Sequence, residues 1–108
     1  MSDTYSTTEH IVGTWIDGKT LYERTIEGNQ NFPSSSGSIT IGTQSDADTL
    51  FVKEGFCSAT GTPFPYVAYN ADYSIACVID ANKNIKAEVG RDRSSFGKPV
   101  VTIRYTKV

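Results

Sequence analysis

The side chains that most often carry out catalysis are sparse in this sequence and follow no familiar catalytic spacing. The single histidine, His10, lies between Glu9 and Ile11 and has no second imidazole with which to bind a metal. Cys57 has no histidine at a motif spacing, no serine stands in a Gly-x-Ser-x-Gly elbow, and the glycines form no phosphate-binding loop. We therefore expect no catalytic residues, no metal and no cofactor, and we interpret His10 as a residue at the edge of a strand.

Acidic residues in expected loops are the remaining candidates for binding an ion. Asp46 and Asp48 fall in one such loop and Asp92 in another. Their spacing does not match a twelve-residue calcium loop, so we interpret them as solvated carboxylates. The densest group of cations surrounds a glycine-serine loop, which we also expect to be solvated, with a phosphate or partner contact as the alternative. This group comprises Arg91, Arg93 and Lys98.

Aromatic side chains form the one group with a positive binding interpretation. Four rings fall in a stretch where Pro63 and Pro65 exclude a central strand, namely Phe64, Tyr66, Tyr69 and Tyr73. Rings on loops can stack on sugar faces while their hydroxyls form hydrogen bonds, which would make this loop a glycan platform. Two other interpretations stay open, because such rings also cap the end of a small core or form an interface with another protein.

The elements that would position these residues begin with a hairpin. Two β-rich runs flank Asp17-Gly18, a pair that favours a two-residue type I′ turn. The register of that turn pairs Trp15 with Thr20 and leaves three side chains on one face, those of Ile11, Trp15 and Tyr22. We expect four residues to anchor the hairpin, namely Trp15, Asp17, Gly18 and Tyr22.

Alternating apolar residues predict further strands at spacings near ten residues, over 38–42, 49–57, 73–79, 85–89 and 99–107. In the last of these, Val101, Ile103 and Tyr105 point inward, and Tyr105 anchors the strand. About seven strands at this spacing predict an all-β fold, a small antiparallel β-sandwich. Residues 1–9 are polar and predict a flexible lead-in to a single domain over residues 10–108.

Composition agrees with this fold and excludes several classes of protein. The 108 residues suit one domain, and 30 of them are valine, isoleucine or threonine against two leucines, which argues against a helical bundle. The net charge of -2, with both signs scattered, provides no basic stripe for nucleic acid or an anionic membrane. We also expect no membrane span and no export signal.

Two cysteines, Cys57 and Cys77, each fall within an expected strand. A cross-strand disulfide is one interpretation, but free buried thiols are favoured for a protein made in a reducing cytoplasm.

Segments at the two ends of the predicted domain carry a further signal. The first reads Tyr-Ser-Thr-Thr-Glu-His-Ile-Val-Gly-Thr-Trp-Ile-Asp-Gly-Lys-Thr-Leu-Tyr-Glu-Arg-Thr-Ile over residues 5–26, and the second reads Val-Thr-Ile-Arg-Tyr-Thr-Lys over residues 101–107. Together they resemble a small module at the C-terminus of tail, tail-fibre and other appendage proteins of bacteriophages and prophages. Thr20 departs from that pattern, which has proline after the lysine, and the loop before Ile39 is also unusual for it.

This resemblance implies a virion protein, made in the cytoplasm of the host bacterium, that acts in assembly or in host-surface attachment. Such appendages are commonly homotrimers, so the expected partners are other virion proteins, further copies of the chain and a host cell-surface glycan. The resemblance identifies no catalytic residues. Two alternatives remain: a purely structural protein that forms a trimer or decorates a capsid, and a small cell-wall glycan hydrolase, which would need a positioned pair of carboxylates.

Overall fold

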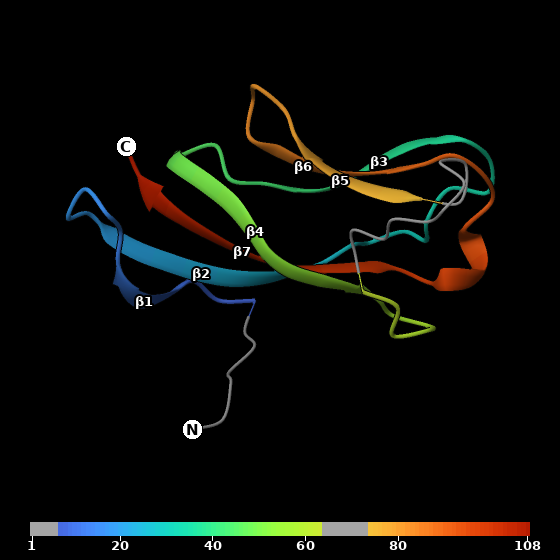
Figure 1. The fold of residues 1–108 in the computed structure, drawn as a ribbon, viewed down its shortest axis with the longest axis horizontal. Helices are drawn as coiled ribbons and strands as arrows, with labels where there is room; N and C mark the ends of the chain where they lie inside the picture. The colour runs from blue at the N-terminus through green and yellow to red at the C-terminus, as the bar shows by residue number, and fades with distance from the viewer. Residues whose placement is uncertain (1–6, 64–73) are drawn as a thin grey trace.

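The computed structural model describes residues 7–63 and 74–108, which form seven strands in two antiparallel sheets stacked as two layers (Figure 1). This arrangement confirms the prediction of an all-β, sandwich-like fold. The strands are β1 (His10–Thr14), β2 (Thr20–Glu27), β3 (Gly37–Thr43), β4 (Ala47–Cys57), β5 (Ile75–Ile79), β6 (Asn84–Val89) and β7 (Pro99–Lys107). A 3₁₀ turn, Ser94–Phe96, precedes β7. No helix in the described residues is long and apolar enough to cross a membrane.

The strand order brings the two ends of the domain together. One sheet has the order β1-β2-β7-β4 and the other has the order β3-β6-β5. Strand β7 therefore pairs with β2 on one side and with β4 on the other, so that Tyr105 lies opposite both Tyr22 and Leu50. The two segments that carry the resemblance lie side by side as β1, β2 and β7.

The core lies between the sheets and is built from alternate residues of their strands. In β7 the side chains of Val101, Ile103 and Tyr105 are fully buried, as the alternation predicts. Each large apolar side chain buried in this way contributes about 1.5–3 kcal/mol. Strand β3 approaches β2 so closely that a Cβ on Gly42 would lie 3.0 Å from Cδ1 of Ile26, so glycine permits the two layers to meet there.

The first hairpin forms where the sequence predicts it, but the predicted register is wrong by one position. Thr14, rather than Trp15, pairs with Thr20. The backbone N–H of Trp15 donates to the carbonyl of Lys19 (2.8 Å), which closes a three-residue loop instead of a two-residue one. In this loop Gly18 has φ 87°, and the Asp17 carboxylate accepts the N–H of Lys19 (3.0 Å). The longer loop needs a positive φ at the glycine alone, whereas a type I′ turn needs it at Asp17 as well.

An irregularity in β1 also overturns the prediction that Ile11, Trp15 and Tyr22 share one face. The pairing of β1 with β2 shifts between Ile11 and Gly13, and such a bulge reverses the alternation beyond it. Tyr22 stacks on buried Tyr105, with ring centroids 5.8 Å apart, and so faces the core. Trp15 contacts Phe51 (5.3 Å), whose partner in β7 is Arg104, the neighbour of Tyr105 on the opposite face.

Candidate functional site

The four aromatic residues predicted as a glycan platform, Phe64, Tyr66, Tyr69 and Tyr73, lie outside the described residues. Within the described part of the chain, a hollow of about 670 Å³ runs between β4 and β5. That volume is within the range of about 300–1,000 Å³ typical of ligand pockets. We call it the β4–β5 groove, and its lining is Leu50, Phe51, Val52, Lys53, Glu54, Gly55, Phe56, Gly61, Pro63, Cys77 and Ile79.

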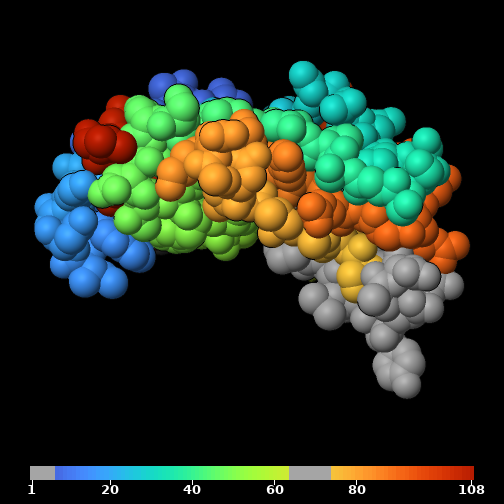
Figure 2. All heavy atoms as spheres, turned by 90° about the horizontal axis from the view of Figure 1, so that it is seen from above, coloured from blue at the N-terminus to red at the C-terminus, as the bar shows by residue number. Residues whose placement is uncertain are grey.

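The groove opens between the facing edges of the two sheets, and side chains such as those of Val52, Phe56 and Ile79 make it apolar. In the described part of the chain, β4 and β5 are both edge strands, and Figure 2 shows the orange surface of β5 and β6 beside the green surface of β4. Charged residues and bulges normally protect such edges from pairing with a strand of another chain. Strand β4 has both, with register shifts on either side of Val52 and charges at Lys53 and Glu54, whereas the sequence of β5 is Ile-Ala-Cys-Val-Ile.

The two cysteines are free, as predicted, and neither thiol has the lowered pKa that is typical of a catalytic cysteine. Cys57 is fully buried in the core, while Cys77 is partly exposed and lines the β4–β5 groove. Burial raises the pKa of each thiol to about 11. Because the thiolate is the nucleophilic form, both side chains are weak nucleophiles at neutral pH.

The opposite side of the sandwich, where β2 meets β3, is polar. The Glu9 carboxylate accepts a short hydrogen bond from the Tyr105 hydroxyl and a second from Nζ of Lys107 (2.8 Å). These hydrogen bonds lower the pKa of Glu9, and the Lys107 ammonium also lies 4.6 Å from the ring centroid of Tyr22. We call these four residues the Glu9 network. All four belong to the two segments that carry the resemblance, so those segments hold one another in place.

A second hollow, of about 510 Å³, lies beside this network. Arg24 spans it, donating from Nε to Gln44 (2.7 Å) and from Nη2 to the carbonyl of Thr43 (2.9 Å). Two carboxylates, Glu9 and Asp46, face the hollow, which is the kind of pair that a glycan hydrolase needs. Glu9 does not suit the role of proton donor, because a general acid needs a raised pKa and the pKa of Glu9 is lowered.

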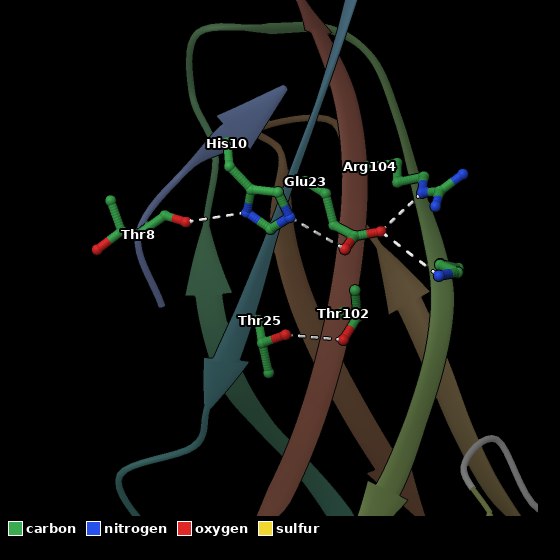
Figure 3. A network of polar contacts seen from close by, with 7 residues as sticks. Thr8, His10, Glu23, Thr25, Thr102 and Arg104 are labelled. Carbon is green, nitrogen blue, oxygen red and sulfur yellow. Dashed lines mark hydrogen bonds and ion pairs between the residues drawn. The ribbon is translucent and has the colours of Figure 1, made fainter. Parts of the chain in front are cut away.

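The outer face of the four-stranded sheet carries a buried carboxylate, Glu23, which is 5% exposed (Figure 3). Its Oε1 accepts a hydrogen bond from Nε of Arg104 (2.8 Å) and lies 3.6 Å from Nζ of Lys53, and its Oε2 lies 3.4 Å from Nε2 of His10. Burial by itself raises the pKa of Glu23, but the Arg104 hydrogen bond and the charges of Lys53, Arg104 and His10 outweigh it and lower the pKa. We call these four residues the Glu23 cluster.

His10 is at the edge of the sheet, as predicted, but its pairing with Glu23 is a contact that the sequence analysis missed. The available signal was the run of polar residues at alternate positions of β2 and β7. Thr25 and Thr102 are buried there and form a hydrogen bond of 2.9 Å between their hydroxyls. The face is therefore a packed polar layer.

Several residues considered for ion or phosphate binding have partners within the chain, and Asp48, predicted in a loop, lies in β4. Asp48 pairs with Lys19 (2.5 Å), and Asp92 accepts the backbone N–H of Ser94 (2.9 Å) at the start of the 3₁₀ turn. The Arg93 guanidinium lies 4.8 Å from the ring centroid of Phe96. Among the residues that the structure describes, no three histidine, cysteine or acidic side chains come together as a metal site.

Comparisons with family models, with curated proteins and with solved structures gave no match to this chain.

Proposed function

We propose that this chain is a non-enzymatic binding module of a phage or prophage virion appendage, and that it acts in assembly by holding a segment of another virion protein in the β4–β5 groove. The groove is the observation that carries the proposal, because it combines an apolar lining with a strand edge that pairs with no other described strand. The virion setting is supported by the resemblance of residues 5–26 and 101–107.

An extended polypeptide fits this groove better than a sugar does. Adding a strand to a free edge gives main-chain hydrogen bonds, and alternate side chains of the added strand enter the adjoining hollow. Strand β5 offers such an edge, and the groove beside it offers Val52, Phe56 and Ile79 as apolar contacts. The two charged residues of the lining, Lys53 and Glu54, would fix the direction of the added strand.

The test is a titration of the ¹⁵N-labelled chain with purified proteins encoded beside its gene. We expect one of them to move the amide signals of β5 and of residues 53–56. Phe56→Ala should weaken that binding about tenfold, because truncating a central aromatic contact typically costs more than 1 kcal/mol. Ile16→Ala is the matched control, since Ile16 is an apolar residue that is 91% exposed at the far hairpin.

The proposal fails if none of these proteins binds, or if the moved signals belong to the hairpin around Ile16. It also fails if the two alanine variants weaken binding equally. A stable homotrimer in sedimentation whose interface covers the groove would instead support the purely structural alternative.

A further inference from the structure

A second surface lies on the outer face of the four-stranded sheet and shares Phe51 and Lys53 with the groove. One row of paired residues crosses this face from β1 to β4, in the order His10, Glu23, Arg104 and Phe51. Beside Phe51 lies Trp15, with the two ring centroids 5.3 Å apart and the ring planes inclined by 36°. Both rings are partly exposed. The row therefore places an aromatic pair directly beside a guanidinium.

The charges of the Glu23 cluster are layered, with the anion beneath the cations. The side chain of Glu23 is 7% exposed, while those of Arg104 and Lys53 are 29% and 35% exposed. One carboxylate faces two permanent cations, so the cluster has an excess of one positive charge even when His10 is neutral. Two carboxylates on the same face, Glu27 and Glu54, pair with β7 at Val100 and Thr102, on the side of the row away from Trp15.

Arg104 retains donors that Glu23 does not use. Its Nε donates to Glu23, and Figure 3 shows the other two nitrogens of the guanidinium pointing away from that carboxylate. A guanidinium can bind a carboxylate or a phosphate through two parallel N–H donors. The ammonium of Lys53 lies beside the same Glu23 oxygen, at 3.6 Å. A second anion would thus meet donors from both cations.

We propose that this surface binds an acidic saccharide, with a sugar ring over Phe51 and Trp15 and the acid group on Arg104 and Lys53. Sugar rings stack on aromatic faces, and neighbouring strands lie about 4.8 Å apart, so a ring over Phe51 brings its acid substituent to Arg104. Charge complementarity selects an acidic ligand over a neutral one, since the exposed groups of the Glu23 cluster are donors. The acid can be a carboxylate or a phosphodiester, and the experiment separates the two.

The test is isothermal titration calorimetry of the chain with three probes: tri-galacturonic acid, its neutral methyl ester and a poly(glycerol phosphate) chain. We expect at least one acidic probe to bind, and the methyl ester to bind at least about tenfold more weakly than the free acid if the carboxylate is the ligand. Binding of the phosphate polymer alone would identify a phosphodiester as the ligand. Binding should also weaken as salt is raised, because ions screen the partly exposed cations.

Two variants test the residues, and each leaves at least one cation beside Glu23. Lys53→Gln leaves Arg104 on the carboxylate. Arg104→Lys keeps a cation there but has a single nitrogen, which Glu23 engages. Each should weaken binding of the acidic probe about fivefold or more, with melting temperatures checked for both. Lys98→Gln and Phe56→Ala are controls that should leave it unchanged, and the second separates this surface from the groove.

The proposal is overturned if neither acidic probe binds or if the methyl ester binds as tightly as the acid. It is also overturned if Lys53→Gln and Lys98→Gln weaken binding equally. The probes contain no polypeptide, and Phe56→Ala should affect only the partner in the groove, so the two proposals can fail separately even though Phe51 and Lys53 line both surfaces.

Discussion

The two sides of the sandwich differ in what their side chains leave available. On the side where β2 meets β3, the Glu9 network joins the residue before β1 to β7, and Arg24 joins β2 to the loop before β4. On the side of β4 and β5, apolar side chains line a groove, and in the described part of the chain β5 pairs with β6 alone. The contacts on the first side stabilise the fold, whereas the second side offers a surface for binding. Substitutions on the first side should therefore lower the free energy of unfolding more than substitutions on the second.

The largest expected effect is the loss of Tyr105, which is fully buried at the centre of the Glu9 network. Tyr105→Ala should lower the free energy of unfolding by about 3–5 kcal/mol, because it leaves a large cavity in the core. For a domain of this size each kcal/mol lowers the melting temperature by roughly 4–8 °C, which thermal denaturation followed by circular dichroism would measure. Tyr105→Phe keeps the ring and removes only the hydroxyl on Glu9, so it should cost about 1 kcal/mol. Equal losses in the two variants would contradict the importance that we assign to the buried ring.

The next effect is the pH dependence that Glu23 confers. Its pKa is lower in the folded chain than the unperturbed value of 4.5, so its contribution to stability is complete above that value and is lost as pH falls through the folded pKa. Glu23→Gln should therefore be less stable than the parent chain by about 1–2 kcal/mol at pH 7, and the difference should shrink below about pH 4. Urea denaturation at several pH values measures both quantities. A difference that stays constant from pH 7 to pH 3 would show that charge is not its cause.

A smaller effect is expected on the groove side, even for an aromatic residue. Phe56 is 43% exposed, so Phe56→Ala should cost less than about 1.5 kcal/mol of stability. Phe32, which is 1% exposed, is the matched control, and Phe32→Ala should cost about 3–5 kcal/mol. If both variants unfold at the same urea concentration, the groove is part of the core and the contrast between the two sides is lost.

The smallest effect is chemical modification of the groove. Iodoacetamide should react with Cys77 in the folded protein and leave the buried Cys57 untouched, as peptide mass mapping would show. Because the pKa of Cys77 is raised to about 11, the reaction should be slow at pH 7 and accelerate about tenfold per pH unit toward pH 10. Modification of Cys57 at the same rate would mean that the native fold opens more readily than the packing of β4 on β7 suggests.

The sequence predicted correctly mainly those features that depend on residues close together in the chain. The inward residues of β7 follow from strict alternation over nine residues, and Pro99–Lys107 is found with the expected bounds. The hairpin register was wrong because Asp17-Gly18 serves either a two-residue or a three-residue loop, and the choice depends on which residues adopt positive φ. The bulge that separates Trp15 from Tyr22 lies beside Gly13, and an isolated glycine within a strand is a signal of a bulge that the prediction did not use.

The candidate surfaces were less accessible to prediction because they join distant positions. The Glu23 cluster unites residues 10, 23, 53 and 104, and no short spacing relates these four. The groove exists because, among the described strands, β4 and β5 are at the edges of their sheets, which is a property of strand order. A glycan platform was predicted from a dense run of rings, whereas Trp15 and Phe51 form a pair only after the hairpin folds across β2 and β7 toward β4.

The central position of β7 has a consequence for biosynthesis. This strand is the last in chain order among the described strands, yet it separates β2 from β4 in the sheet. Until the ribosome has made β7, β2 and β4 have no shared neighbour, and the apolar face of each lies open to other nascent chains. The four-stranded sheet can close only after residues 99–107 emerge. Such late, long-range pairing is slow, so the yield of folded protein should depend on protecting these faces during translation.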